Sequence, residues 1–134
     1  MDGSKKYQIE RYSSFDRSIE KIIKAHYKKN PQALKEFEDV FELLIQALTL
    51  DPFFRLTHAE PMPKGIQMIG WEFRKLYFNL PGLTRGKAAE QGRIMYLVNE
   101  EQHRVAPLIL YTHDEYAKRP SDQEIRRWMQ SVTS

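Results

Sequence analysis

The chain contains no cysteine, and this absence excludes disulfide bonds, zinc sites built on thiolates and a cysteine nucleophile. It is neutral to mildly favourable for a reducing compartment. Long apolar runs are also missing: no stretch approaches the roughly 18 apolar residues of a membrane span, and Met1–Lys6 has no apolar signal core. We therefore expect a cytoplasmic protein with no membrane partner.

Signals for a metal or a small-molecule cofactor are absent as well. There is no glycine-rich phosphate-binding loop, no internal repeat and no low-complexity tract. The chain has four histidines, and they show no metal-ligand spacing: His26, His58, His103 and His113. The sequence therefore predicts neither a metal site nor a bound cofactor.

What the chain does have is enough apolar content for one core. With 134 residues, of which 41% are hydrophobic, residues 1–134 are expected to form a single domain. The net charge is +3, and lysine and arginine outnumber aspartate and glutamate 8 to 4 in residues 1–30 and 11 to 8 in residues 61–134, but not in residues 31–60, where the ratio is 2 to 6. The basic flanks are either ordinary solvated faces or a surface for nucleic acid.

Two helices are predicted in the first half of the chain. Ser13 or Ser14 caps a helix that runs to about Lys29, with apolar residues at helical spacing. Asn30-Pro31 starts a second helix after almost no loop, and Asp51-Pro52 ends it. Two helices joined so tightly form an antiparallel hairpin. It is expected to bury Phe37, Phe41 and Leu44 against a sheet.

The strands follow the hairpin, apart from one weak edge strand before it. Aromatic and branched residues separated by turn residues predict strands at residues 71–78, 92–98 and 105–111, with a further weak alternation at 7–12. Residues 53–70 and 79–91 are rich in proline, glycine and charge and predict loops, and Ser121 opens a short final helix. The expected fold is α+β: an antiparallel sheet with an N-terminal helical hairpin and a short C-terminal helix, all helices on one face.

Polar groups gather near the ends of these strands, and they suit cleavage of RNA without a metal. That reaction needs a base for the 2′-hydroxyl, cations for the charge on phosphorus and an acid for the leaving oxygen. Arg93 begins a strand and is either a phosphate clamp or a surface arginine. His113 follows the last strand and is either the acid or base, or only a turn residue.

The remaining candidates also have two interpretations each. Glu72 and Arg74 share a strand face, so they form either a base and a second phosphate donor or only an ion pair. Tyr116 is a stacking ring or proton donor, or a packed ring, and Lys118 is a phosphate contact or a solvated amine. Further candidate phosphate contacts lie in the basic 79–91 insertion: Arg85 and Lys87.

Four short motifs follow one another along the chain: Asp51-Pro52-Phe53, Lys64-Gly65, Trp71-Glu72-Phe73-Arg74 and Gly92-Arg93-Ile94-Met95-Tyr96. Their order and spacing resemble the RelE/HigB family of bacterial toxins, within the wider RelE/ParE superfamily. The similarity covers about residues 15–130. The 79–91 insertion and the acidic pair Asp114-Glu115 depart from the family pattern.

The resemblance implies a RelE/ParE-like fold and a ribosome-dependent mRNA endonuclease, the toxin of a toxin–antitoxin pair. Its implied partners are mRNA on the ribosome and a cognate antitoxin protein. Two other functions stay open on the same scaffold, because fold alone does not decide function. They are a non-catalytic relative that binds nucleic acid or protein, and a ParE-like inhibitor of gyrase.

Overall fold

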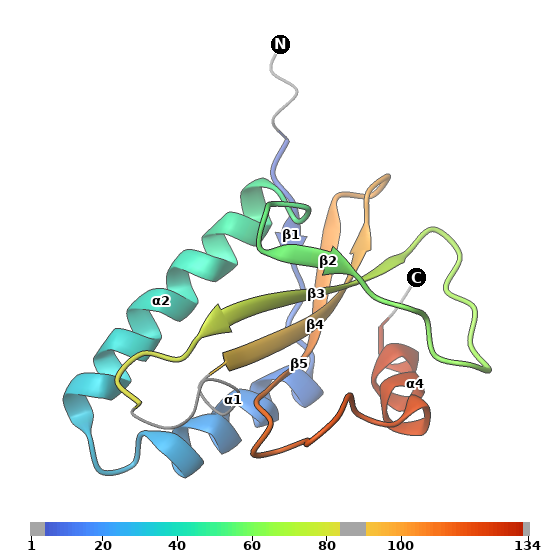
Figure 1. The fold of residues 1–134 in the computed structure, drawn as a ribbon. Coiled ribbons are helices and arrows are strands. Elements are labelled where there is room, and N and C mark those ends of the chain that lie inside the picture. The colour runs from blue at the N-terminus through green and yellow to red at the C-terminus, as the bar shows by residue number, and fades with distance from the viewer. Residues whose placement is uncertain (1–4, 84–90, 133–134) are drawn as a thin grey trace.

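Five strands and three helices form within residues 5–83 and 91–132, which are the residues that the computed structural model describes. In chain order they are β1 (Gln8–Ile9), α1 (Ser13–His26), α2 (Pro31–Leu50), β2 (Thr57–Ala59), β3 (Glu72–Asn79), β4 (Gln91–Asn99), β5 (Arg104–Tyr111) and α4 (Asp122–Gln130). Figure 1 shows the helical hairpin at the N-terminal end of this order and the short helix at its C-terminal end. The predicted α+β class is confirmed.

The sheet is mixed. Its strands lie in the order β1-β5-β4-β3-β2, and all neighbours are antiparallel except β1, which runs parallel to β5 through Gln8↔Arg104 and Ile9↔Val105. The prediction of a purely antiparallel sheet is therefore wrong. Periodicity assigns side chains to faces but says nothing of strand direction, and no hairpin links β1 to β5 to force an antiparallel pair.

The helix ends differ in how well the sequence predicts them. Asn30 caps α2 by accepting a hydrogen bond from the Ala33 N–H at 3.0 Å, and the predicted limits of α2 are confirmed. The N-cap of α1 is Tyr12, which makes no side-chain capping bond, so the predicted caps lie inside the helix. Ser14 instead donates to the carbonyl oxygen of Leu108 at 2.7 Å. The helix ends at His26 rather than Lys29.

One face of the sheet packs against α1 and α2. The buried helical residues include Phe15, Ile19, Ile22, Phe37, Leu44 and Leu48, and the strands contribute Leu76, Phe78, Ile94, Tyr96, Val98, Val105 and Leu110. The predicted burial of Phe37 and Leu44 is confirmed, since they are 1% and 8% exposed. Phe41 is half-buried and stacks on Phe15 and Phe37, with ring centroids 5.9 and 6.0 Å apart.

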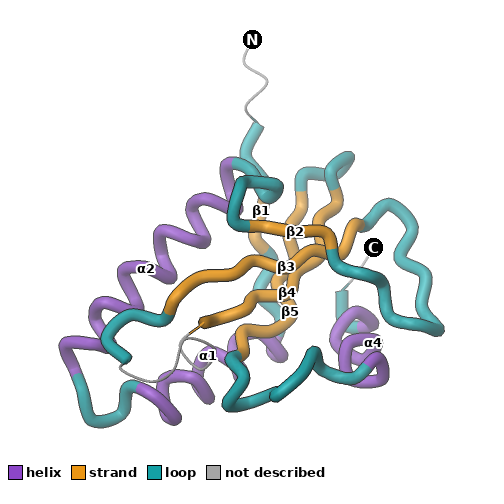
Figure 2. The backbone as a smooth tube through the Cα atoms, in the orientation of Figure 1, coloured by secondary structure: helices purple, strands orange, loops and turns teal. Residues whose placement is uncertain are grey.

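The opposite face packs against α4, and Figure 2 shows α2 and α4 on either side of the sheet. We call it the α4 face. Its buried residues are Trp71, Phe73, Met95, Leu97, Ala106, Leu108, Ile109 and Tyr111 from the sheet side, and Ile125, Met129 and Val132 from α4 and the turn after it. The prediction that all helices share one face is wrong, because the unbroken apolar run 94–98 in β4 needs cover on both sides.

A bulge in β5 sets which of its residues reach the α4 face. Met95 pairs with Ile109, but Tyr96 pairs with Pro107, so Leu108 is an extra residue without a direct partner. Leu108 and Ile109 therefore both lie in the second core, although successive side chains in a regular strand alternate. The bulge brings Tyr111 onto the α4 face.

The predicted loop 53–70 contains the edge strand β2. It pairs with β3 through Thr57↔Leu76, His58↔Lys75 and Ala59↔Arg74. A strand of three residues is too short to show a period in the sequence. The rest of the loop reaches α4, where Arg126 donates to the carbonyl oxygen of Lys64 at 2.5 Å.

The stacked rings between the hairpin and the sheet provide a stability prediction. Phe37→Ala should lower the free energy of unfolding by about 3–5 kcal/mol, because it removes a buried ring and leaves a cavity. Leu43 lies on the same helix but is 64% exposed, so Leu43→Ala should change it by no more than about 0.5 kcal/mol. Denaturant unfolding measures both. Equal losses would show that α2 does not pack through the Phe37 side.

A second prediction concerns the bond that holds β1 on β5. Arg104 donates to both carboxylate oxygens of Glu10, at 2.7 and 2.8 Å, and this pairing lowers the pKa of Glu10 below its ordinary value of 4.5. A lowered pKa stabilises the fold above pH 4.5 and ceases to do so as the pH falls through the folded-state pKa. Glu10→Gln should therefore reduce stability at pH 7, and its difference from the wild type should shrink below pH 4.5 in thermal melts.

Candidate nucleic-acid interface

The register of the three central strands places Tyr77, Arg93 and Tyr111 side by side. Tyr77 pairs with Arg93, and Arg93 pairs with Tyr111. Directly paired residues share a sheet face, and Tyr111 belongs to the α4 face. Lys75 is two residues before Tyr77 and so lies on the same face, as does His58, which pairs with Lys75.

The Tyr77 ring is the centre of this group. The Lys75 ammonium lies 5.4 Å from the ring centroid, the Arg93 guanidinium carbon 5.7 Å, and the His58 ring centroid 5.5 Å in an edge-on arrangement. We call His58, Lys75, Tyr77 and Arg93 the Tyr77 cluster. Cations within about 6 Å of an aromatic face are attracted by it. The cluster thus combines positive charge, an aromatic ring and an imidazole.

Arg93 has unusual partners for a buried guanidinium. It is 7% exposed, donates to the carbonyl oxygen of Gln91 at 2.9 Å and to its side-chain oxygen at 3.0 Å, and otherwise touches the Tyr77 ring. All these partners are neutral. Among the described residues no carboxylate lies within salt-bridge distance of it. A buried charge is stabilised chiefly by an opposite charge, and the described residues give this guanidinium none within salt-bridge distance.

Lys75 has a carboxylate partner, but it shares that partner. Its ammonium lies 3.3 Å from one oxygen of Glu60, and Arg119 donates to the other oxygen at 2.8 Å. Arg119 also contacts Asp122 at 3.4 Å. The Glu60 side chain is 8% exposed, so the shared carboxylate is largely shielded from water, whereas the Asp122 side chain is 41% exposed. With Arg93 beside it, the region retains more positive than negative charge.

His113 lies at the same end of the sheet as Arg93, two residues beyond Tyr111, and is exposed. Its turn is held by Glu115, which accepts hydrogen bonds from the N–H and the hydroxyl of Thr112, both at 2.7 Å. The other Glu115 oxygen is 3.1 Å from Nε2 of His26. No described contact joins His113 to Arg93, so its catalytic role stays a prediction.

Tyr116 packs on the strand end rather than standing free. Its ring meets Tyr111 edge to face, with centroids 5.6 Å apart. Burial, and then the neighbouring Glu124 carboxylate, raises the pKa of Tyr116 to about 12. Burial also raises the pKa of Tyr111 to about 12. Both phenols are neutral near pH 7, so Tyr116 can donate a proton in a hydrogen bond but is not a base. Lys118 is exposed in the same segment.

Glu72 and Arg74 lie on the opposite face of the sheet from Arg93. They share a face, as predicted, but it is the face of the helical hairpin, since they alternate with Phe73, Lys75 and Tyr77. Arg74 donates to Glu72 at 2.6 Å and to the Thr57 hydroxyl at 2.8 Å. Of the two predicted interpretations, the structure shows the ion pair. The candidates Arg85 and Lys87 lie outside the described residues.

Sequence reasoning missed His58, Lys75 and Tyr77 as site residues. Lys75 and Tyr77 carry a detectable signal, because they continue the face of Phe73 at a spacing of two. Their approach to Arg93 depends on the β3–β4 register, which the long 79–91 insertion leaves open. His58 lies in a strand with no sequence signal, so its place could not be predicted.

Comparison with known proteins does not add a family. No protein-family model matches the chain, and no curated protein matches it. Within residues 5–83 and 91–132, no helix is long and apolar enough to cross a membrane. In the same residues no three acidic or histidine side chains are grouped so as to hold a metal ion.

The shared carboxylate of Glu60 can be tested directly. Glu60→Gln leaves Lys75 and Arg119 without their common partner and should lower the free energy of unfolding by about 1.5–3 kcal/mol, as lost bonds to charged groups do. The exposed pair of Lys35 with Asp39, at 2.8 Å, is the matched control: Asp39→Asn should cost no more than about 0.5 kcal/mol. Calorimetry decides, and equal effects would mean that the Glu60 network is solvated.

Proposed function

We propose that the protein is a RelE/HigB-like, ribosome-dependent mRNA endonuclease that uses the Tyr77 cluster. The observation that carries the proposal is the Arg93 guanidinium, largely buried with only neutral described partners and placed against an aromatic ring. A guanidinium of this kind suits a phosphate, which it can bind in a planar fork. The Tyr77 ring beside it can stack on a base.

Cleavage would follow metal-independent acid–base chemistry. A base takes the proton of the 2′-hydroxyl, whose oxygen attacks phosphorus; the bond to the 5′-oxygen breaks, and an acid protonates that oxygen. The products are a 2′,3′-cyclic phosphate and a 5′-hydroxyl. Arg93 and Lys75 would stabilise the charge that builds on the phosphate oxygens. His58 and His113 are the candidate proton carriers, because an imidazole ring can both accept and donate a proton.

Because the Tyr77 cluster is small, we propose that the ribosome helps to position the RNA. His58 contacts Tyr77, but His113 has no described contact with Arg93, so the protein alone need not position RNA for reaction. Messenger RNA held on the ribosome would be the substrate, and a cognate antitoxin would be the protein partner that blocks it. The assignment of both partners rests on the sequence resemblance to the RelE/HigB family.

A protein that binds RNA without cutting it is the second candidate. The separation of His113 from the described contacts of Arg93 favours it. In that case the Tyr77 cluster would hold a phosphate and a base, and no bond would break. Messenger RNA binding would then survive with no cleavage product.

The catalytic proposal predicts a graded loss of cleavage on programmed ribosomes. Arg93→Ala should slow cleavage by about 10²–10³-fold, because it removes stabilisation of transition-state charge. Arg93→Lys should recover little, since an ammonium lacks the planar fork. His113→Ala and His58→Ala should each slow cleavage by about 10²–10⁴-fold if each transfers a proton. Free RNA should be cut poorly by the wild type.

The control is Lys6→Ala, which removes an exposed lysine beside Thr49 and Leu50 of α2, before β1 at the opposite edge of the sheet from β2. It should leave cleavage unchanged. Thermal melts show whether each variant is folded. Full cleavage by folded Arg93→Ala and both histidine variants would rule out this site. A wild type that binds ribosome-held mRNA but yields no 2′,3′-cyclic phosphate would support the non-cutting candidate.

A further inference from the structure

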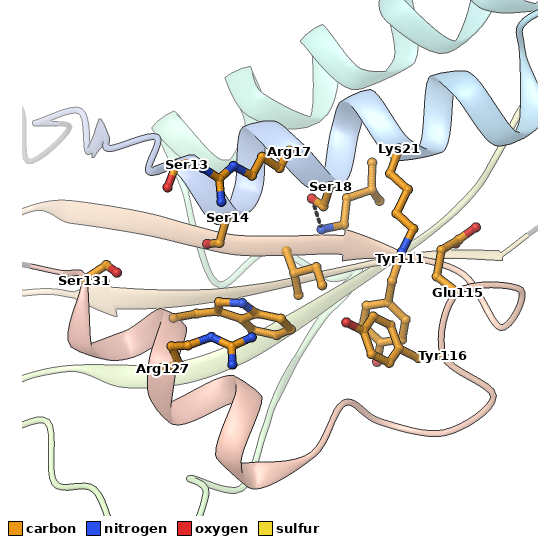
Figure 3. A pocket seen from close by; sticks show the side chains of 13 residues that line it. Ser13, Ser14, Arg17, Ser18, Lys21, Tyr111, Glu115, Tyr116, Arg127 and Ser131 are labelled. Atoms are coloured by element: carbon orange, nitrogen blue, oxygen red, sulfur yellow. Dashed lines mark hydrogen bonds between the residues drawn. The ribbon is translucent and has the colours of Figure 1, made fainter.

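Three cationic side chains surround a cleft at the open edge of β5. The strand β1 pairs only with Arg104 and Val105, so it leaves the later part of β5 without a strand beside it. Between α1 on one face and α4 on the other lies a cleft of about 390 Å³. Figure 3 shows Arg17 and Lys21 reaching it from α1, Arg127 and Ser131 from α4 and its end, and Glu115 and Tyr116 from the segment after β5.

The β5 edge in this cleft does not need another strand as a partner, because side chains of α1 already form hydrogen bonds with two of its backbone groups. Ser14 donates its hydroxyl to the Leu108 carbonyl oxygen at 2.7 Å. Ser18 accepts from the Leu110 N–H at 2.9 Å and donates to the Phe15 carbonyl oxygen at 2.7 Å. An exposed strand edge otherwise recruits a partner strand through such groups. An occupant of the cleft must therefore be recognised by side chains.

Those side chains are mostly positive. Arg17 and Lys21 are one helical turn apart on α1, and Arg127 faces the same cleft from α4. All three are exposed, and within the described residues none of them has a salt bridge. The acidic lining residue, Glu115, uses both oxygens elsewhere: one with the N–H and hydroxyl of Thr112, the other with His26. Three like charges around one cleft repel one another until an anion binds.

The cleft also offers aromatic surface and a suitable size. Trp128 and Tyr116 line it, and the Tyr116 phenol is neutral near pH 7. Small-molecule sites commonly enclose about 300–1,000 Å³ and combine apolar or aromatic walls with a few placed polar groups. Cations beside an aromatic ring match a phosphate attached to a flat base.

We propose that this cleft binds a nucleotide, with Arg17, Lys21 and Arg127 on the phosphate and Trp128 against the base. The ligand is either a free nucleotide or one nucleotide of single-stranded RNA, since both present the same chemistry. The site does not require the endonuclease proposal. It is separate from the Tyr77 cluster, although Tyr111 reaches both.

Binding can be followed by tryptophan fluorescence, because the chain has only two tryptophans and the other, Trp71, lies in the second core. Adenosine monophosphate, a labelled eight-nucleotide RNA and inorganic phosphate are titrated into the full-length protein. The nucleotide or the RNA should quench the wild type. Trp128→Phe should lose the quenching and bind adenosine monophosphate more weakly in calorimetry, while its affinity for inorganic phosphate stays the same.

Charge reversal separates this site from general attraction to a basic protein. Arg17→Glu combined with Lys21→Glu should weaken binding by about tenfold or more, whereas Arg55→Glu, an exposed reversal far from the cleft, should have little effect. Tight binding of adenosine monophosphate alone identifies a free nucleotide as ligand, and tight binding of RNA alone identifies a single strand. No binding of either, or equal weakening by Arg55→Glu, overturns the proposal.

The outcome of the nucleotide-binding experiment is independent of the endonuclease test. The cleft variants are measured for ligand binding without ribosomes, and the Arg93 and histidine variants are measured for cleavage on ribosomes. Arg93→Ala should keep the fluorescence response of the cleft. Loss of that response in folded Arg93→Ala would show that the ligand binds at the Tyr77 cluster instead, and so would overturn a separate site.

Discussion

The burial of β4 on both faces is the constraint on which the rest of the structure depends. Residues Ile94–Val98 are at most 1% exposed, and they alternate between the two cores. A strand of this kind cannot lie at an edge or under a single layer, because half of its apolar side chains would then face water. The sheet must therefore have helices on both sides. The hairpin supplies one layer and α4 the other.

The same constraint positions the candidate interface. The register of β4 with both neighbours decides which of its side chains enter each core, since a slip by one residue would exchange its two faces. That register puts Arg93 between Tyr77 and Tyr111 on the α4 face. The side chain is thus held by the apolar residues that follow it in the same strand. An arginine on a rigid central strand is better fixed than one on a loop.

The sequence predicted the parts of this fold that have a period, a cap or a proline. The limits of α2 came from Asn30-Pro31 and Asp51-Pro52, and the three long strands came from their aromatic and branched residues. The prediction from sequence is wrong or incomplete where those signals are absent. Strand direction leaves no periodic trace, so the sequence does not predict the parallel pairing of β1, and β2 is too short to have a pattern.

The candidate site was predicted only in part, for the same physical reason. Arg93 and His113 share an end of the sheet, as strand order alone suggests. The separation of Glu72 from Arg93 follows from the β3–β4 register, which a hairpin with a long insertion does not reveal. The bulge at Leu108 leaves no signal in the sequence either. It nevertheless decides that Tyr111 lies on the same face of the sheet as Arg93.

The fold separates the acidic and basic side chains of the chain in space. The acidic residues of α2, among them Glu36, Glu38 and Glu42, are exposed on the helix that covers the far face of the sheet. The cations of the Tyr77 cluster lie on the α4 face, and those of the cleft lie at its border. A polyanion is attracted to one side of such a molecule and repelled from the other. The two proposed sites meet at Tyr111, so a single strand that occupied both would pass across the end of β5 and away from α2.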